Sequence, residues 1–220
     1  MRFATVRSSL CLALALFFSL LSACGGGSDH DDPPPANDPP PTTTQPPPPP
    51  VPVPPPFSLA AGYTDLVAGT INSPPGWPAW SGTGQPVAGV GCLINEDYHI
   101  HALVSIYKDG VRQGLPDNIG RSGCAYELHT HDVTGTIHIE TNVPKTFTLG
   151  QLFALWRQPL LASGTAGLAG PIRFYVIDKE VLTPYTGDPG AIELTAHREI
   201  VIVSGTPPAT LPKYRWPSGI

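Results

Sequence analysis

The stretch CAYELHTHDVTGTIHIE, residues 124–140, alternates apolar and polar side chains on either side of a short turn-forming segment, residues 132–135. This period-2 pattern predicts two β-strands joined as a hairpin. Successive side chains of a strand point to opposite faces, so the ionisable side chains of both strands fall on the same face. They are Glu127, His129, His131, His138 and Glu140.

The four-residue turn predicts a register in which His129 faces His138 and Glu127 faces Glu140. Directly opposed residues have Cβ atoms about 4.5–5.5 Å apart, so the two imidazoles can bind one ion. The two carboxylates repel each other unless a cation or a proton lies between them.

A second histidine-rich strand precedes the hairpin. The sequence HIHALVSIYKDG, residues 99–110, alternates cleanly and places His99 and His101 on one face, as a natural chelate. With the His-x-His and His-x-Glu motifs of the hairpin, the chain has more nitrogen and carboxylate ligands than one ion needs. This set suits Cu(II), Zn(II), Fe(II) or Ni(II). We expect a transition-metal site, most simply for copper or zinc; the alternative is surface or hydrogen-bonded core histidines on polar strand faces.

The two His-x-His motifs do not continue as cupin motifs. A cupin needs Glu after the second histidine, with three or four residues in between. Ser105 and Ile106 occupy those positions after the first motif, and Gly135 and Thr136 occupy them after the second.

Two of the four cysteines, Cys92 and Cys124, lie in the region with the strand patterns. In an exported protein they predict a disulfide. The alternative is that one cysteine joins the histidines in a blue-copper site. Such a site also uses an axial methionine, and the only methionine of the chain is Met1.

The N-terminal residues 1–23 have the features of a signal peptide. An apolar stretch, residues 10–21, follows two arginines and is shorter than a typical transmembrane helix. The sequence LSAC at 21–24 resembles a bacterial lipoprotein lipobox, which implies cleavage before Cys24 and lipid attached to it. By analogy with lipoprotein sorting, Gly25 favours an outer-membrane lipoprotein that faces the periplasm or the cell surface. An ordinary secretory signal is the alternative.

Residues 24–56 form a proline-rich linker, with 15 of the chain's 29 prolines between Pro33 and Pro56. This composition predicts a disordered tether that favours polyproline II, and so does not pack a core. The remaining residues, 57–220, suit one globular domain. They carry 13 acidic and 10 basic residues, which gives no basic patch and argues against nucleic acid as a partner.

The rest of the domain predicts a mostly β fold with one short helix. Thr148 and Gln151 in FTLGQL form a capping box, from which a helix runs to about residue 156 and stops before Pro159. Short apolar runs bounded by turn signals predict strands at 87–94, 172–178, 192–195 and 197–203. We therefore expect an antiparallel β-sandwich or barrel.

Four strings together resemble a module of exported or lipid-anchored bacterial and archaeal proteins of unknown function. They are HIHALVSIYKDG, LHTHDVTGTIHIE, FTLGQLFALW and LTAHREIVIVSGTPP, spread over about residues 90–208. The resemblance implies no particular activity. It adds His197, in LTAH, as a further candidate ligand, although a strand-end histidine with no such role is an equal alternative.

Three functions follow from these patterns. The first is a lipid-anchored metal-binding module for sequestration, delivery or redox handling. The second is a metalloenzyme that uses Glu127 or Glu140 as a base. The third is a wall-binding or adhesion domain in which Trp77, Trp80 and Trp216 line the ligand surface.

Overall fold

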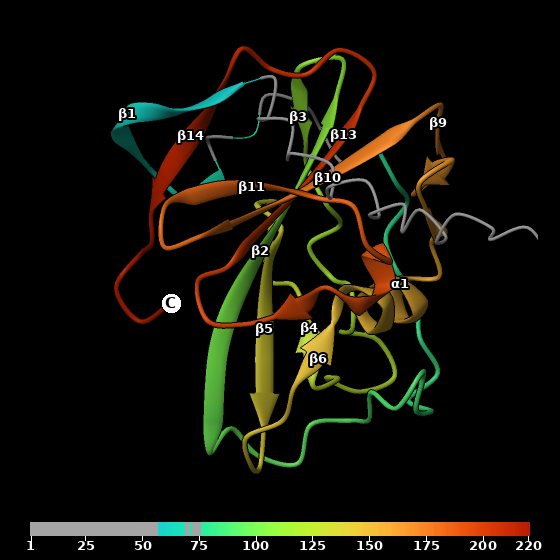
Figure 1. Cartoon of the computed structure of the whole chain (residues 1–220). Helices are drawn as coiled ribbons and strands as arrows, with labels where there is room; N and C mark the ends of the chain where they lie inside the picture. The colour runs from blue at the N-terminus through green and yellow to red at the C-terminus, as the bar shows by residue number, and fades with distance from the viewer. Residues whose placement is uncertain (1–56, 69–70, 72–75) are drawn as a thin grey trace, which may run out of the picture. The chain divides into compact units, whose positions relative to one another are not determined.

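The computed structural model of the chain describes residues 57–68, 71 and 76–220. All of them belong to one unit, Pro49–Ile220. The predicted signal peptide, residues 1–23, and the whole of the predicted linker, residues 24–56 with Cys24, lie outside the described residues. Figure 1 shows the elements, which are β1 (Ser58–Asp65), β2 (Tyr98–Lys108), β3 (Val111–Gln113), β4 (Leu128–His129), β5 (Thr136–Thr141), β6 (Phe147–Thr148), α1 (Leu149–Trp156), β7 (Leu160–Leu161), β8 (Gly164–Thr165), β9 (Leu168–Ala169), β10 (Ile172–Asp178), β11 (Val181–Tyr185), the 3₁₀ turn η2 (Pro189–Ala191), β12 (Glu193–Leu194), β13 (Glu199–Ser204) and β14 (Thr210–Arg215).

A mixed sheet of seven strands is the centre of the fold. Its order is β11-β10-β13-β2-β5-β4, and β3 pairs with the end of β2. β13 and β2 run parallel, whereas the other pairs in this sheet are antiparallel. The small β1–β14 sheet is also parallel. The mostly β prediction is confirmed, with these two parallel pairs as departures from a wholly antiparallel arrangement, and the described residues form no closed barrel.

The larger hydrophobic core lies on the face of this sheet that meets α1. Alternation along β2, β5 and β13 sends every second apolar side chain to this face, where they pack on the helix. These strand residues are Ala102, Val104, Ile106, Ile137, Ile139, Ile200 and Ile202. The helix contributes Leu149, Leu152, Phe153, Leu155 and Trp156, all buried.

The opposite face of the sheet has two regions. Around β10 and β13 it carries a smaller core, in which Val201 and Val203 pack with Phe57 and with Leu211 of β14. Around β2, β5 and β4 the same face carries histidines, because the side chains that alternate with Ala102 and Ile139 point there. The sheet therefore separates the helix and the main core from the polar residues.

Helix α1 begins as the sequence predicts. Thr148 Oγ1 accepts a hydrogen bond from the Gln151 amide (3.4 Å), and Gln151 Oε1 accepts one from the Thr148 amide (3.0 Å). The helix ends at Trp156, and the residue that caps it, Arg157, adopts a left-handed conformation with φ 60°. Among the described residues no helix is long and apolar enough to cross a membrane.

Cys92 and Cys124 form the predicted disulfide. It links the irregular segment before β2 to the segment that leads into β4. The two cysteines are 32 residues apart in the sequence, so the bond closes a loop whose entropy is worth about 3–4 kcal/mol in the unfolded chain.

Two local predictions differ from the structure, and one pair of strands was not predicted. Residues 87–94 contain only isolated bridges, Val87 with Val90 and Cys92 with Tyr126, and no extended strand. The first strand of the hairpin is limited to Leu128–His129. The proline-rich segment after residue 205 contains β14, which pairs with β1, and neither strand was predicted from the sequence.

Trp77 and Trp80 do not form a free aromatic surface. The indole of Trp80 is buried and donates to the Leu155 carbonyl oxygen (2.8 Å), and that of Trp77 donates to the Ala166 carbonyl oxygen (2.7 Å). Trp77 also packs edge-to-face on Trp156 of α1. Both tryptophans therefore belong to the core on the helix side of the sheet.

Candidate metal site

Three neighbouring strands bring the histidines together. His101 of β2 pairs with His138 of β5, and His138 pairs on its other side with His129 of β4. His99 pairs with Glu140 one step along the same face. The predicted register of the hairpin, 129 with 138, is confirmed, and β5 lies between the two His-x-His segments.

The local folding of this region follows from its sequence. Ile137 and Ile139 are fully buried on the helix side, which forces His138 and Glu140 to the other face of β5. The turn before β5 is closed by Asp132, whose carboxylate accepts hydrogen bonds from the amide and hydroxyl of Thr134. Gly135 has φ 80°, and a Cβ there would lie 2.2 Å from the Val104 carbonyl oxygen, so this position requires glycine.

The first half of the cluster lies between β2 and β5. His138 Nδ1 is 3.0 Å from His101 Nε2 and 3.4 Å from His99 Nε2. Glu140 Oε1 is 3.0 Å from His99 Nε2 and 3.3 Å from His138 Nδ1. Four side chains thus direct donor atoms at one small volume.

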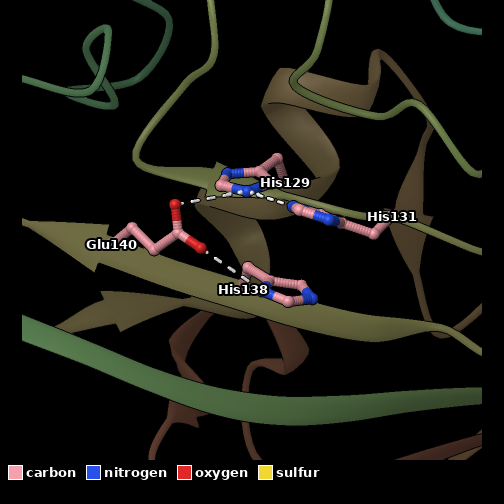
Figure 2. A group of neighbouring side chains, drawn as sticks. All are labelled: His129, His131, His138 and Glu140. Atoms are coloured by element: carbon pink, nitrogen blue, oxygen red, sulfur yellow. Dashed lines mark hydrogen bonds and ion pairs between the residues drawn. The ribbon is translucent and has the colours of Figure 1, made fainter. Parts of the chain in front are cut away.

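The second half lies toward β4, and Figure 2 shows it with His138 and Glu140. His129 Nε2 is 2.8 Å from His131 Nε2 and 3.5 Å from Glu140 Oε2. His129 Nδ1 is 2.8 Å from the Tyr126 carbonyl oxygen, which can only accept. In the neutral ring Nδ1 therefore carries the proton, and the lone pair of Nε2 faces the cluster, as in the outer-shell contacts of metal-bound histidines.

Burial keeps the imidazoles of His101, His129 and His138 neutral. His101, His129 and His138 are buried, whereas His99 and His131 are exposed and mark the opening to solvent. Desolvation is the main cause that lowers the pKa of His101 to about 4 and of His138 to about 3, and neighbouring imidazoles lower them further. Desolvation also lowers the pKa of His129 and His131. A neutral imidazole has the free lone pair that a metal ion requires.

Glu140 is the buried carboxylate of the cluster. Burial raises its pKa, while the nearby His99 acts in the opposite direction. Its side chain is 5% exposed, and the ion-pair contacts that the structure gives it are all to imidazoles, namely those of His99, His129 and His138.

The donor separations match those around a metal ion. In a tetrahedral site with bonds of about 2.0–2.1 Å, two ligand atoms lie about 3.3 Å apart. The contacts of Glu140 and His138 given above are 3.0–3.5 Å. Three overlapping groups of residues have ligand atoms close enough together to hold a metal ion. They are His129 with His131, His138 and Glu140; His99 with His101 and His138; and Glu96 with His99 and Glu140.

Two candidate residues lie outside these groups. Glu127 is opposite Glu140 through a backbone hydrogen bond, but its carboxylate accepts from the Gly91 amide (2.9 Å) and pairs with Lys145 (2.7 Å). Lys145 thus supplies a positive charge beside Glu127. His197 is exposed, stacks on Trp216 and donates to the main-chain oxygen of Ile220 (3.1 Å). Only its backbone amide reaches the site strand, at the His101 carbonyl oxygen.

Sequence reasoning missed Glu96. It lies two residues before β2, so strand alternation gives no information about its direction. Its proximity in sequence to His99 was the only signal. As an exposed residue it adds a carboxylate at the rim of the first half of the cluster.

Comparison of the chain with protein-family models, with curated proteins and with solved structures gives no match. The function is therefore inferred from the residues of the site. A buried group of histidines with one carboxylate, open to solvent on one side, is able to bind a metal ion.

Proposed function

We propose that this protein binds a transition-metal ion in the cell envelope and serves to sequester, deliver or carry out redox handling of that ion. The observation that supports the proposal is the convergence of five imidazoles and one carboxylate from three paired strands and from the segment just after β4, at separations that suit a bound ion. Nitrogen-rich sites with one carboxylate favour Cu(II) and Zn(II).

The envelope location rests on the sequence. The predicted signal peptide, residues 1–23, and the lipobox at 21–24 favour an outer-membrane lipoprotein anchored through Cys24. The disulfide between Cys92 and Cys124 is consistent with an oxidising compartment. Anchoring by lipid would tether the metal site to the membrane through the proline-rich linker.

The test uses the full-length protein without a polyhistidine tag. Elemental analysis after dialysis against Zn(II) or Cu(II) should find at least one bound ion per chain. The midpoint of thermal unfolding should rise when the ion is added and fall back to its original value when a chelator removes the ion. An ion present at 100 times its dissociation constant stabilises the folded state by about 2.7 kcal/mol. His129→Ala/His138→Ala should abolish binding. His30→Ala, which changes a histidine of the predicted linker, should not. A folded protein that retains no ion and shows no thermal shift would rule the proposal out.

A metalloenzyme is the second candidate, and one observation favours it. A cavity of about 420 Å³ lies on the histidine face of the sheet, lined by Leu103, Glu199 and Tyr214 among others. Leu103 is two residues from His101 on the same face of β2, which corresponds to about 7 Å along the strand. A substrate in this cavity would therefore lie near the first half of the cluster.

A further inference from the structure

We propose that the site holds two metal ions bridged by the carboxylate of Glu140. The inference rests on the proposed metal binding and adds the number of ions and the residues that each ion uses. It follows from how the imidazoles are paired, from the position of Glu140 and from which donor atoms share a metal-like spacing.

Four of the imidazoles form two close pairs. His101 Nε2 and His138 Nδ1 are 3.0 Å apart, and His129 Nε2 and His131 Nε2 are 2.8 Å apart. At these distances each pair shares a single proton in an N–H···N hydrogen bond. A metal ion that binds both nitrogens takes the place of that proton, so each pair marks one ion position.

Glu140 lies between the two pairs and gives one oxygen to each. Its Oε1 contacts His138 Nδ1 (3.3 Å) and His99 Nε2 (3.0 Å), whereas its Oε2 faces His129 Nε2 (3.5 Å). Figure 2 shows the two oxygens directed toward His129 and His138 respectively. A carboxylate that presents its two oxygens to two donor sets can bridge two ions, whose separation in two-metal sites is about 3.5–4 Å.

One ion cannot use all of these donors. Ligand atoms on opposite sides of an ion are at most about 4.2 Å apart. Of the donor groups with metal-like spacing, one holds His99 and His101 and another holds His129 and His131, while His138 belongs to both. Among the described residues no such group joins His99 or His101 to His129 or His131. The two ends of the cluster therefore serve different ions.

The two positions therefore have different ligand sets. The first has His99, His101, His138 and Glu140 Oε1, with Glu96 at its rim as a second carboxylate. The second has His129, His131 and Glu140 Oε2. The second set has one donor fewer, and its exposed member, His131, leaves it accessible to solvent.

Calorimetric titration of the full-length, untagged protein with Zn(II) tests the stoichiometry, and elemental analysis after gel filtration checks it. We expect two ions per chain. One ion would overturn the two-ion inference and leave the proposed function intact, whereas no ion would overturn both.

Single variants at the exposed edge of each half assign the ions without disturbing the core. His99→Ala should weaken the first ion by about tenfold or more and leave the second nearly unchanged, and His131→Ala should do the reverse. His197→Ala, which alters an exposed histidine outside the groups, is the matched control. If two ions bind and neither substitution changes the affinity of either ion, the assignment is contradicted.

Cu(II) gives a separate readout of the bridge. The first equivalent should give the electron paramagnetic resonance spectrum of an isolated Cu(II), and the second should broaden or reduce it by magnetic coupling. In Glu140→Gln the second equivalent should bind at least about tenfold more weakly. Two bound Cu(II) ions with additive, uncoupled spectra would overturn the bridged arrangement.

Discussion

Glu140 and Glu199 are buried carboxyl groups on the same face of one sheet, and their partners differ. Glu140 meets imidazoles. Glu199 accepts a hydrogen bond from Ser105 Oγ (2.6 Å) and lies near the guanidinium of Arg112. Burial raises the pKa of Glu199 to about 7, and Ser105 and Arg112 offset only part of that effect. The contacts of Glu140 thus suit a role as a metal ligand. Glu199 is instead a buried carboxyl group whose titration changes the stability of the fold.

The pH dependence of stability should change in Glu199→Gln. Between the ordinary glutamate value of 4.5 and about 7, the folded state holds a proton that the unfolded state has lost. Glu199 therefore makes its full contribution to the free energy of unfolding below pH 4.5. This contribution, about 3 kcal/mol, is lost as the pH rises through 7. Glutamine cannot ionise and still accepts from Ser105, so the variant should be more stable than the natural protein at pH 8.

Urea unfolding of the metal-free proteins at pH 5 and pH 8 measures this effect. The histidines titrate alike in both proteins, so the comparison isolates Glu199. Glu193→Gln, a change at an exposed glutamate, should leave the pH dependence unaltered. If Glu199→Gln and the natural protein lose stability equally between the two pH values, then the carboxyl of Glu199 does not titrate as described.

At the residue scale, strand alternation was sufficient to predict most of the site. It placed His99 with His101, and His129 with His138 and Glu140, because buried isoleucines fix which face each strand presents. It could not predict that Lys145 would engage Glu127, since Lys145 comes from a segment outside the strands. Nor could it predict the packing of His197 on Trp216, which depends on the path of the C-terminal segment.

At the scale of elements, α1 is defined by its first residues and by the core that it covers. Its apolar side chains pack on the face of the sheet that points away from the histidines. The helix can therefore be weakened without a direct change to the metal ligands.

Thr148→Ala should lower the free energy of unfolding by about 1 kcal/mol, because it removes the hydroxyl that accepts from the Gln151 amide. For a domain of this size the thermal midpoint should fall by about 3 °C. Metal stoichiometry should stay the same. Thr206→Ala, at an exposed threonine, serves as the control. Thermal unfolding of both variants checks the prediction, and an equal effect of the two substitutions would contradict it.

The helix and the long strands could be predicted because their signals are local. The capping box Thr148-x-x-Gln151 and the alternation of residues 99–107 each depend on a few neighbouring residues. The segment 87–94 shows the limit of this approach. Its apolar residues are compatible with a strand, but a disulfide and isolated bridges to distant segments hold it instead. The pairing of β14 with β1, near opposite ends of the domain, likewise has no local signal.

At the scale of the whole molecule, the sequence combines a predicted lipid anchor, a proline-rich linker and a domain with a candidate metal site. The linker would place the domain up to roughly 75 Å from the membrane if residues 33–56 adopted polyproline II. In this arrangement the anchor determines where the protein is and the β domain determines what it binds. The two properties should therefore be separable by mutation.

Cys24→Ser removes the proposed lipid acceptor and should release the protein from the membrane fraction of a Gram-negative host. Labelling with radioactive palmitate should be lost, because serine has no thiol to be modified, whereas metal stoichiometry and thermal midpoint should not change. Cys92→Ser/Cys124→Ser is the matched cysteine control. It should keep the label and the membrane association but lose about 3–4 kcal/mol of stability with the disulfide. A Cys24→Ser protein that remains labelled and membrane-bound would show that residue 24 is not the anchor.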